Sequence, residues 1–207
     1  MWINSAHVRE VDTQLNRTMR IISGTLMATS LPWLLVVSNI APPDIRRKAA
    51  LKRECFKISS NHSLPIHQDF PPEESRLISR KPPLRLGSML LQDNFTPAAD
   101  WAAQWGGFRG FNKELVNDPT LGVSGMNLPR REWSLLNRFR TGIGGCNYWR
   151  FRWGQAESQS CDCGADQQTM NHVVNDCPLR CFSGGIESLN RATGEALCWL
   201  DGLDISL

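Results

Sequence analysis

Apolar residues near the start of the chain recur at spacings of three and four. Within residues 6–22 these positions are Val8, Val11, Leu15, Met19 and Ile22. This period places them on one face of an α-helix, because side chains three and four residues apart lie one above another. Ser5 precedes the stripe and Gly24 follows it, and these residue types favour the first and last turns of helices. The pattern predicts a helix over 6–22.

A run of apolar residues, LPWLLVV, comes next and is followed by Pro42 and Pro43. We expect a short helix over Trp33–Ile40 and a longer one over Asp44–Ile58, with the two prolines fixing the joint between them. Residues 21–43 carry no charge. Small and polar residues interrupt this stretch, so no apolar run reaches the roughly 20 residues that a membrane span requires. The sequence therefore predicts buried structure here and no membrane contact.

The middle of the chain shows no sustained apolar period. Six prolines fall within residues 58–97. This composition is typical of a linker. Within it, short helices are predicted only near Glu73–Ser79 and Ala98–Trp105.

A second folded unit is predicted to begin near Leu128. In LPRREWSLLNRFRTG, the leucines and the phenylalanine share one helix face and the arginines occupy the other. Any strand is expected to be short and to lie in Cys146–Trp153. The predicted fold is thus mainly α: a small helical bundle within 1–58, an irregular Pro-rich linker with short helices over 59–127, and a small helical unit over 128–207.

Charge is distributed unevenly along the chain. The total of +3 over 207 residues decides nothing about nucleic acid, but residues 44–57 carry +4 and residues 130–153 carry +5. A basic helix face is also common on ordinary surfaces, and a tryptophan at helical spacing is more often part of a core. The candidate nucleic-acid contacts are Arg46, Arg47, Lys48, Arg130, Arg131, Arg138, Arg140, Trp149, Arg150, Arg152 and Trp153.

The C-terminal residues have the opposite sign. Residues 161–207 carry −5, with carboxylates that include Asp201 and Asp204. These carboxylates could hold a protein partner or could simply be solvated.

The segment CDCGADQQTMNHVVNDC gathers three of the seven cysteines and one of the four histidines. Its spacing is C-x-C-x8-H-x4-C, and structural zinc sites commonly use three cysteines and one histidine in a tetrahedron. A short helix over Gln168–Asp176 is expected to carry the histidine. The predicted zinc ligands are Cys161, Cys163, His172 and Cys177.

Other interpretations of this cluster stay open. The thiols could be free and buried, two of them could form a disulfide, or Cys181 could replace one ligand. The first twenty residues carry five charges among polar side chains, which is untypical of a secretion signal. We therefore expect an intracellular protein, nuclear or cytoplasmic, in which cysteines are thiols or metal ligands.

The order of these motifs resembles the region that follows the polymerase domain in reverse transcriptases of non-LTR retrotransposons, especially jockey-like ones. The resemblance is carried by LPRREWSLLNRFRTGIGGC, RWG, CDCG, QTMNHVV, CPL and WLDGLDISL. The N-terminal segments NSAHVREVDTQLNRTMRIISGTL and LPWLLVVSNIAPPDIRRKAAL are similar to the thumb-like helices of the same polyproteins. Together they cover about two-thirds of the chain.

The resemblance implies that the four cluster residues form the family's C-terminal CCHC zinc knuckle, which handles element RNA or target DNA. It implies no polymerase activity for this chain, since the sequence contains no Asp-Asp pair that could serve as the catalytic palm aspartates. No other catalytic constellation is evident. The expected function is nucleic-acid binding by a fragment that lacks the palm and the endonuclease, and the alternative is a non-catalytic protein-interaction or scaffold fragment.

Overall fold

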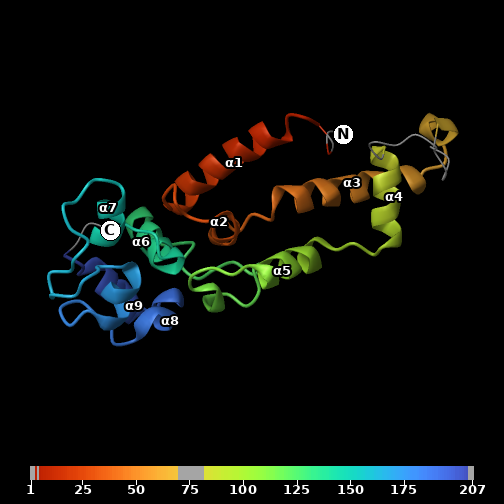
Figure 1. Cartoon of the computed structure of the whole chain (residues 1–207). Coiled ribbons are helices and arrows are strands. Elements are labelled where there is room, and N and C mark those ends of the chain that lie inside the picture. Colours follow the sequence, from red (N-terminus) through yellow and green to blue (C-terminus); the bar gives the residue numbers. More distant parts are fainter. Residues whose placement is uncertain (1–2, 4, 70–81, 205–207) are drawn as a thin grey trace. The chain divides into compact units, whose positions relative to one another are not determined.

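The computed structural model describes residues 3, 5–69 and 82–204. Within these residues the protein is mainly α-helical and contains no strand, which confirms the predicted fold class (Figure 1). The expectation that any strand would lie in Cys146–Trp153 is corrected, because residues 147–152 form a helix there. The short helix predicted near Glu73–Ser79 lies outside the described residues.

Most of the predicted helices end close to their expected bounds. The helices of the first half are α1 (Val8–Ser23), α2 (Leu31–Ser38), α3 (Pro43–Ser59), η1 (Pro65–Asp69), α4 (Pro83–Gln92) and α5 (Pro97–Gly107). Those of the second half are η2 (Lys113–Leu115), α6 (Arg130–Thr141), α7 (Asn147–Arg152), η3 (His172–Asp176), α8 (Gly185–Asn190) and α9 (Gly194–Asp201). Helices α1, α2, α3 and α5 match the sequence predictions to within two residues at each end, because apolar periodicity, prolines and glycines mark their limits.

The chain forms two compact units that interleave along the sequence. Unit 1 comprises Met1–Leu15 and Ala41–Gly107, and unit 2 comprises Asn16–Ile40 and Phe108–Leu207. The predicted 1–58 segment is therefore shared between both units, and so is the 59–127 segment. The bounds differ because α2 is buried in unit 2 whereas α3 is buried in unit 1, although the two helices are neighbours in sequence.

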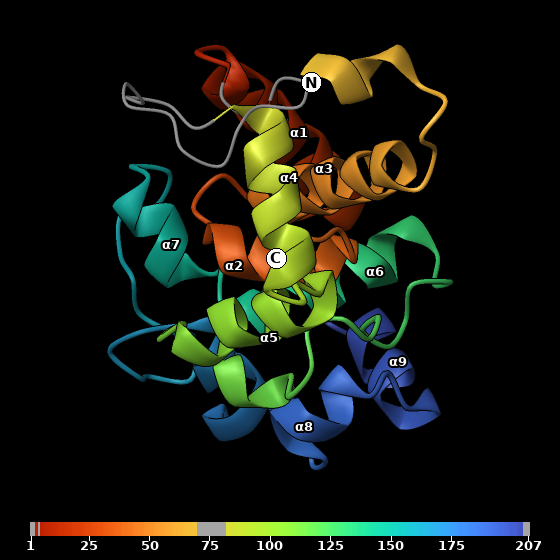
Figure 2. The same cartoon turned by 90° about the vertical axis from the view of Figure 1, so that its right-hand side faces the viewer.

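Unit 1 is built around the contact between α3 and α4, which lie against each other in Figures 1 and 2. Leu51 and Cys55 of α3 are buried, and Gly87 of α4 sits directly over Cys55. A Cβ at Gly87 would lie 2.7 Å from the Cys55 Cβ, so only glycine permits this approach. Lys52 Nζ also donates to the Phe95 carbonyl at 2.6 Å. Residues 83–107 of the predicted linker are therefore folded.

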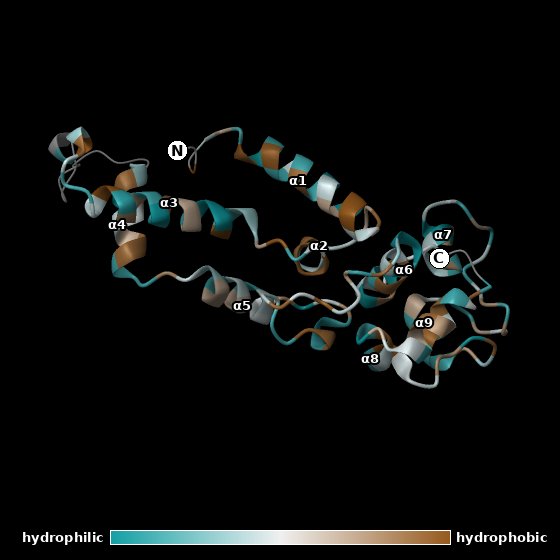
Figure 3. Ribbon diagram, turned by 180° about the vertical axis from the view of Figure 1, so that it is seen from behind, coloured by the Kyte–Doolittle hydropathy of each residue, from teal (hydrophilic) through white to brown (hydrophobic). Residues whose placement is uncertain are grey.

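Helix α2 belongs to the interior of unit 2. Trp33, Leu34, Val36 and Val37 are all fully buried, and Figure 3 shows the helix as hydrophobic around its circumference. The indole Nε1 of Trp33 donates to the Phe111 carbonyl at 2.8 Å. The predicted burial of residues 21–43 is confirmed for most of α2 but not for the whole stretch, because Ile21, Ile22 and Met27 are exposed. Among the described residues no helix is long and apolar enough to span a bilayer.

Helix α6 organises the rest of unit 2. Its apolar face carries Leu136 and Phe139 into a core that also contains residues of α8 and α9. Its polar face meets the C-terminal end of α1, where carbonyl groups have no partner within the helix. Four side chains of α6 donate to the carbonyls of residues 21–24: Arg130, Trp133, Asn137 and Arg138.

The close approach of α6 to α1 requires a glycine at residue 24. Gly24 has φ +68°, and a Cβ there would lie 2.0 Å from Ser134 Oγ and 2.8 Å from Ser134 Cα. Because the second distance involves the backbone, a different serine rotamer cannot relieve the clash.

We predict that Gly24→Ala lowers the free energy of unfolding by about 3 kcal/mol, combining left-handed backbone strain with overpacking. Gly154→Ala is the matched control, since Gly154 has φ +70° but a Cβ there would meet nothing within 4 Å. It should lose only about 1 kcal/mol, the cost of the backbone alone. Denaturant unfolding of both variants measures the difference. Equal losses would show that α6 does not approach Gly24 this closely.

Candidate metal centre

A tight turn positions the first two ligands of the cluster. The Cys161 carbonyl accepts the Gly164 N–H at 2.9 Å, and the Cys161 N–H donates to the Ala165 carbonyl at 2.9 Å. Gly164 adopts φ +93°, a left-handed conformation that glycine tolerates best. The chain therefore reverses within five residues and presents both thiols of the C-x-C pair.

A single wide turn, η3, positions the other two ligands. The Cys177 N–H donates to the His172 carbonyl at 2.7 Å, a bond that spans five residues, and Thr169 Oγ1 accepts the His172 N–H at 3.0 Å. The expected helix over Gln168–Asp176 is thus shorter than predicted and wound as a π-turn. Such turns are often found at functional sites. This one brings its first residue, His172, and the residue that follows it, Cys177, to the same site.

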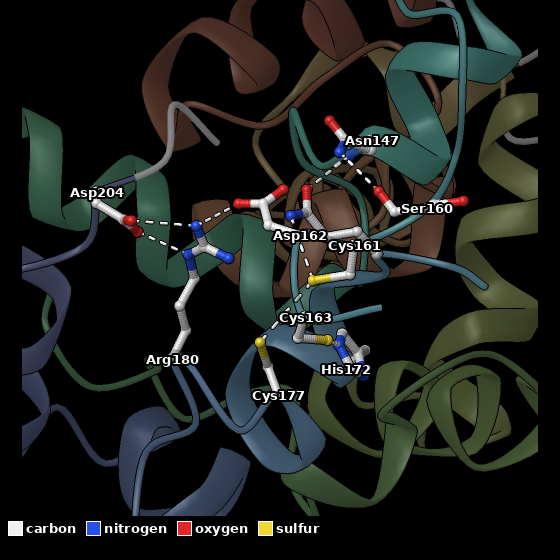
Figure 4. Close-up of polar contacts among 10 residues, drawn as sticks. Asn147, Ser160, Cys161, Asp162, Cys163, His172, Cys177, Arg180 and Asp204 are labelled. Atoms are coloured by element: carbon white, nitrogen blue, oxygen red, sulfur yellow. Dashed lines mark hydrogen bonds and ion pairs between the residues drawn. The ribbon is translucent and has the colours of Figure 1, made fainter. Parts of the chain in front are cut away.

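The four side chains converge, as Figure 4 shows. One ligand atom from each of Cys161, Cys163, His172 and Cys177 lies within 4.8 Å of the other three. The Sγ atoms of Cys161 and Cys177 are 3.8 Å apart, and Cys163 Sγ is 3.2 Å from His172 Nε2. Two sulfurs at about 2.3 Å from a shared tetrahedral zinc would be about 3.8 Å apart, whereas a disulfide needs about 2.0 Å. The arrangement can hold a metal ion, and the thiols are free.

Burial and hydrogen bonding act in opposite directions on the thiols. Burial raises the pKa of Cys161, but hydrogen bonds from the Cys163 N–H and the Gln168 amide outweigh it and lower the pKa to about 6. At Cys163 the Ala165 N–H lowers the pKa, but burial and the neighbouring thiols of Cys161 and Cys177 together raise it. The thiolate is the form that binds metal, so Cys161 is well prepared as a ligand.

Gln168 supports the ligand cluster through hydrogen bonds. Its Nε2 donates to Cys161 Sγ at 3.6 Å, its Oε1 accepts the Asn147 N–H at 3.0 Å, and its carbonyl accepts the Tyr148 N–H at 3.1 Å. Buried partners of this kind orient metal ligands. Gln168 therefore connects the ligand cluster to the start of α7. The sequence does not predict this role, because a single glutamine between ligands has no distinctive spacing.

Arg180 connects the C-x-C turn to the residues after α9. It forms ion pairs with Asp162 at 2.5 Å and Asp204 at 2.7 Å, and these hydrogen bonds, Asp204 first, raise its pKa (Figure 4). Its carbonyl accepts the Trp199 Nε1–H at 2.7 Å. Asp201 pairs with Arg131 at 2.8 Å. The two carboxylates considered for a protein partner, Asp201 and Asp204, thus already have intramolecular partners.

Arg140 was among the predicted nucleic-acid contacts, but it is 0% exposed. Its guanidinium donates to Asn137 Oδ1, Asn190 Oδ1 and the carbonyls of Ser124 and Asn190, at 2.7–3.0 Å. No carboxylate is among these acceptors, and burial lowers the Arg140 pKa to about 9. The prediction for Arg140 is corrected, because a side chain enclosed in this way does not reach a phosphate. The prediction rested on the charge of Arg140, and the sequence did not show that its guanidinium would have buried hydrogen-bond partners.

The basic residues around α7 are placed differently. Arg150 and Arg152 are exposed, and Arg152 donates to the Tyr148 hydroxyl at 3.0 Å. Trp149 stacks on Trp153 with ring centroids 5.8 Å apart, and its Nε1 donates to the Gly142 carbonyl at 2.8 Å. Trp149 therefore has a structural role, while Trp153 keeps an exposed surface.

The candidate contacts of α3 are partly occupied within unit 1. Arg47 forms a two-bond ion pair with Asp12, at 2.7 and 3.2 Å. Lys48 Nζ lies 3.4 Å from an Asp100 oxygen. Arg46 is exposed. On α6, Arg130 and Arg138 donate to carbonyls of residues 21–24, and Arg131 pairs with Asp201.

The ligand assignment predicts different outcomes for two nearby cysteines. Cys177→Ser removes a ligand atom of the cluster and should reduce metal affinity by at least about 100-fold, because a hydroxyl is a poor substitute for a thiolate. Cys181→Ser, four residues later, is the control, since Cys181 is exposed and lies outside the cluster. Competition titration with a chromogenic chelator measures both. A loss with Cys181→Ser and none with Cys177→Ser would reverse the assignment.

Comparison with known proteins identifies no relative of this chain. The chain matches no family model, no curated protein and no solved structure. Any function must therefore be inferred from the residues themselves.

Proposed function

We propose that this chain is a nucleic-acid-binding C-terminal region of a retrotransposon RNA-directed DNA polymerase, without the catalytic palm or the endonuclease. In this proposal Cys161, Cys163, His172 and Cys177 hold a structural zinc ion. The observation that carries it is the convergence of these four ligand atoms within 4.8 Å, beside a helix with exposed arginines.

The chemistry of the ligand set supports zinc. Three thiols and one imidazole form a soft set, which favours zinc over magnesium or calcium. The 3.8 Å between the sulfurs of Cys161 and Cys177 fits tetrahedral coordination. All four positions come from the protein, so no open position would remain to activate water. The zinc would therefore stabilise the fold and take no part in a reaction.

The type and placement of the cations support nucleic acid as the partner. Residues 128–207 contain arginine but no lysine. Arginine is suited to phosphates because its guanidinium can donate two parallel hydrogen bonds. Arg150 and Arg152 on α7 are exposed next to the surface of Trp153, on which a base could stack. Gln168 joins this helix to the ligand cluster, so zinc would help to fix its position.

The retroelement origin depends on the order of the motifs in the sequence. The absence of an Asp-Asp pair means that the proposed role is binding, with polymerisation carried out elsewhere. A protein-interaction role through Asp201 and Asp204 is less well supported, because both carboxylates already form ion pairs.

Fluorescence anisotropy with the zinc-loaded chain tests this function. Single-stranded RNA and duplex DNA are titrated over a salt series, and log affinity should fall linearly with log salt as phosphates release counterions. Arg150→Gln should reduce the slope for the single strand by about 0.7, the value for one phosphate contact.

Arg191→Gln is the control. Arg191 is similarly exposed, follows the ligand cluster in the sequence and pairs with Glu187. It should leave the slope unchanged. Absence of binding at low salt, or an affinity independent of salt, would contradict a nucleic-acid-binding function.

A further inference from the structure

A hollow of about 410 Å³ lies in unit 2 at the C-terminal end of α1. Four of its lining residues are arginines: Arg17, Arg20, Arg130 and Arg138. No acidic residue is among the described residues that line it. The sequence predicted a role in binding for Arg130 and Arg138 but not for Arg17 or Arg20, and it did not predict that α1 and α6 would bring the four together.

Two of these arginines, Arg17 and Arg20, form no ion pair with a carboxylate among the described residues. Arg20 donates to the Asn16 and Thr29 carbonyls through long bonds of 3.3 and 3.4 Å, and its Nε is buried without a hydrogen-bond partner in the described structure. Buried donors normally have an acceptor. Arg17 is exposed and has no carboxylate within ion-pair distance among the described residues. An anion in the hollow would give the Arg17 guanidinium an ion-pair partner and would offer Arg20 a stronger acceptor than these two carbonyls.

Repulsion between the arginines also favours an anionic ligand in this hollow. Burial lowers the pKa of Arg138, and the positive charge of Arg130 lowers it further, so these two cations are close enough to destabilise each other. Arg130 donates to the Ile22 carbonyl of α1, and Arg138 donates to the carbonyl of Gly24, the residue after α1. A bound anion would relieve the repulsion without moving either side chain.

The hollow also has an apolar wall. Ile21 and Met27 line it, and they are 71% and 74% exposed. Large apolar side chains exposed beside cations suit a ligand with one charged and one flat apolar part. A phosphate joined to a nucleobase has this combination, and the volume is within the range of pockets for small ligands.

We propose that this hollow binds one nucleotide of a single-stranded nucleic acid. Its phosphate accepts hydrogen bonds from Arg17 and Arg20, and its base packs on Met27 and Ile21. A duplex would bind more weakly, since its bases are stacked inside and cannot enter the hollow. This inference rests on the proposed nucleic-acid-binding function and names a site for it that is separate from α7.

The test compares a short labelled oligothymidine with an abasic strand of the same length, using anisotropy and the zinc-loaded full chain. Arg17→Gln should weaken binding of both strands about tenfold, because both carry the phosphate. Met27→Ala should weaken binding of oligothymidine severalfold and leave the abasic strand unaffected, because only the base contacts Met27.

Two controls match these changes. Arg9→Gln removes the same charge from another exposed position of α1 that does not line the hollow, and Leu121→Ala removes a similarly exposed apolar side chain elsewhere in unit 2. Both controls should bind each strand like the parent chain. Because all four positions are exposed, the variants should fold, and far-UV circular dichroism confirms it.

The outcomes separate this inference from the proposed function. If the parent chain binds strands while Arg17→Gln and Met27→Ala bind equally well, the hollow is not the site and the function stands. Equal loss with both strands in Met27→Ala would overturn the base contact. Displacement of the strand by a polyglutamate peptide at the same charge concentration would identify a docking site for acidic protein instead. Absence of strand binding by the parent chain would contradict both proposals.

Discussion

The fold of the C-terminal region depends on the meeting of two short turns at one point. The C-x-C turn and the π-turn η3 each have few internal hydrogen bonds, and the ligand atoms of Cys161, Cys163, His172 and Cys177 join them. Metal binding to such sets contributes about 10–16 kcal/mol in zinc-finger peptides, which is comparable to the whole stability of a typical domain. The adjacent Val173 and Val174 then enter the core beneath α6, and Gln168 fixes the start of α7.

Helix α6 shows that arginines take different roles according to the groups around them. Arg140 is enclosed by neutral oxygens, Arg130 and Arg138 donate to the end of α1, and Arg131 pairs with an acid. Arg150 and Arg152, on the next helix, are exposed and form no ion pair with a carboxylate among the described residues. The same guanidinium therefore serves as a core residue, a helix cap or a surface cation, according to the acceptors around it.

The sequence predicted the features that depend on residues close together in the chain. Helix α1 followed from its apolar period and from Gly24, α3 from its prolines, and the ligand set from its spacing, which the structure brings together. It did not predict the two interleaved units, Gln168, or the burial of Arg140. These depend on contacts between distant residues, such as Trp33 with Phe111, 78 positions apart, and Arg130 with Ile22, 108 positions apart. No local pattern encodes such pairs.

The central claim is that one ion is held by three sulfurs and one nitrogen of this cluster. X-ray absorption at the zinc edge, on the purified full chain with measured metal content, tests it most directly. The account predicts one zinc per chain, with three sulfurs at about 2.3 Å and one nitrogen at about 2.0 Å. A chain that retains no zinc, or a spectrum with two sulfurs and oxygen ligands, would contradict it.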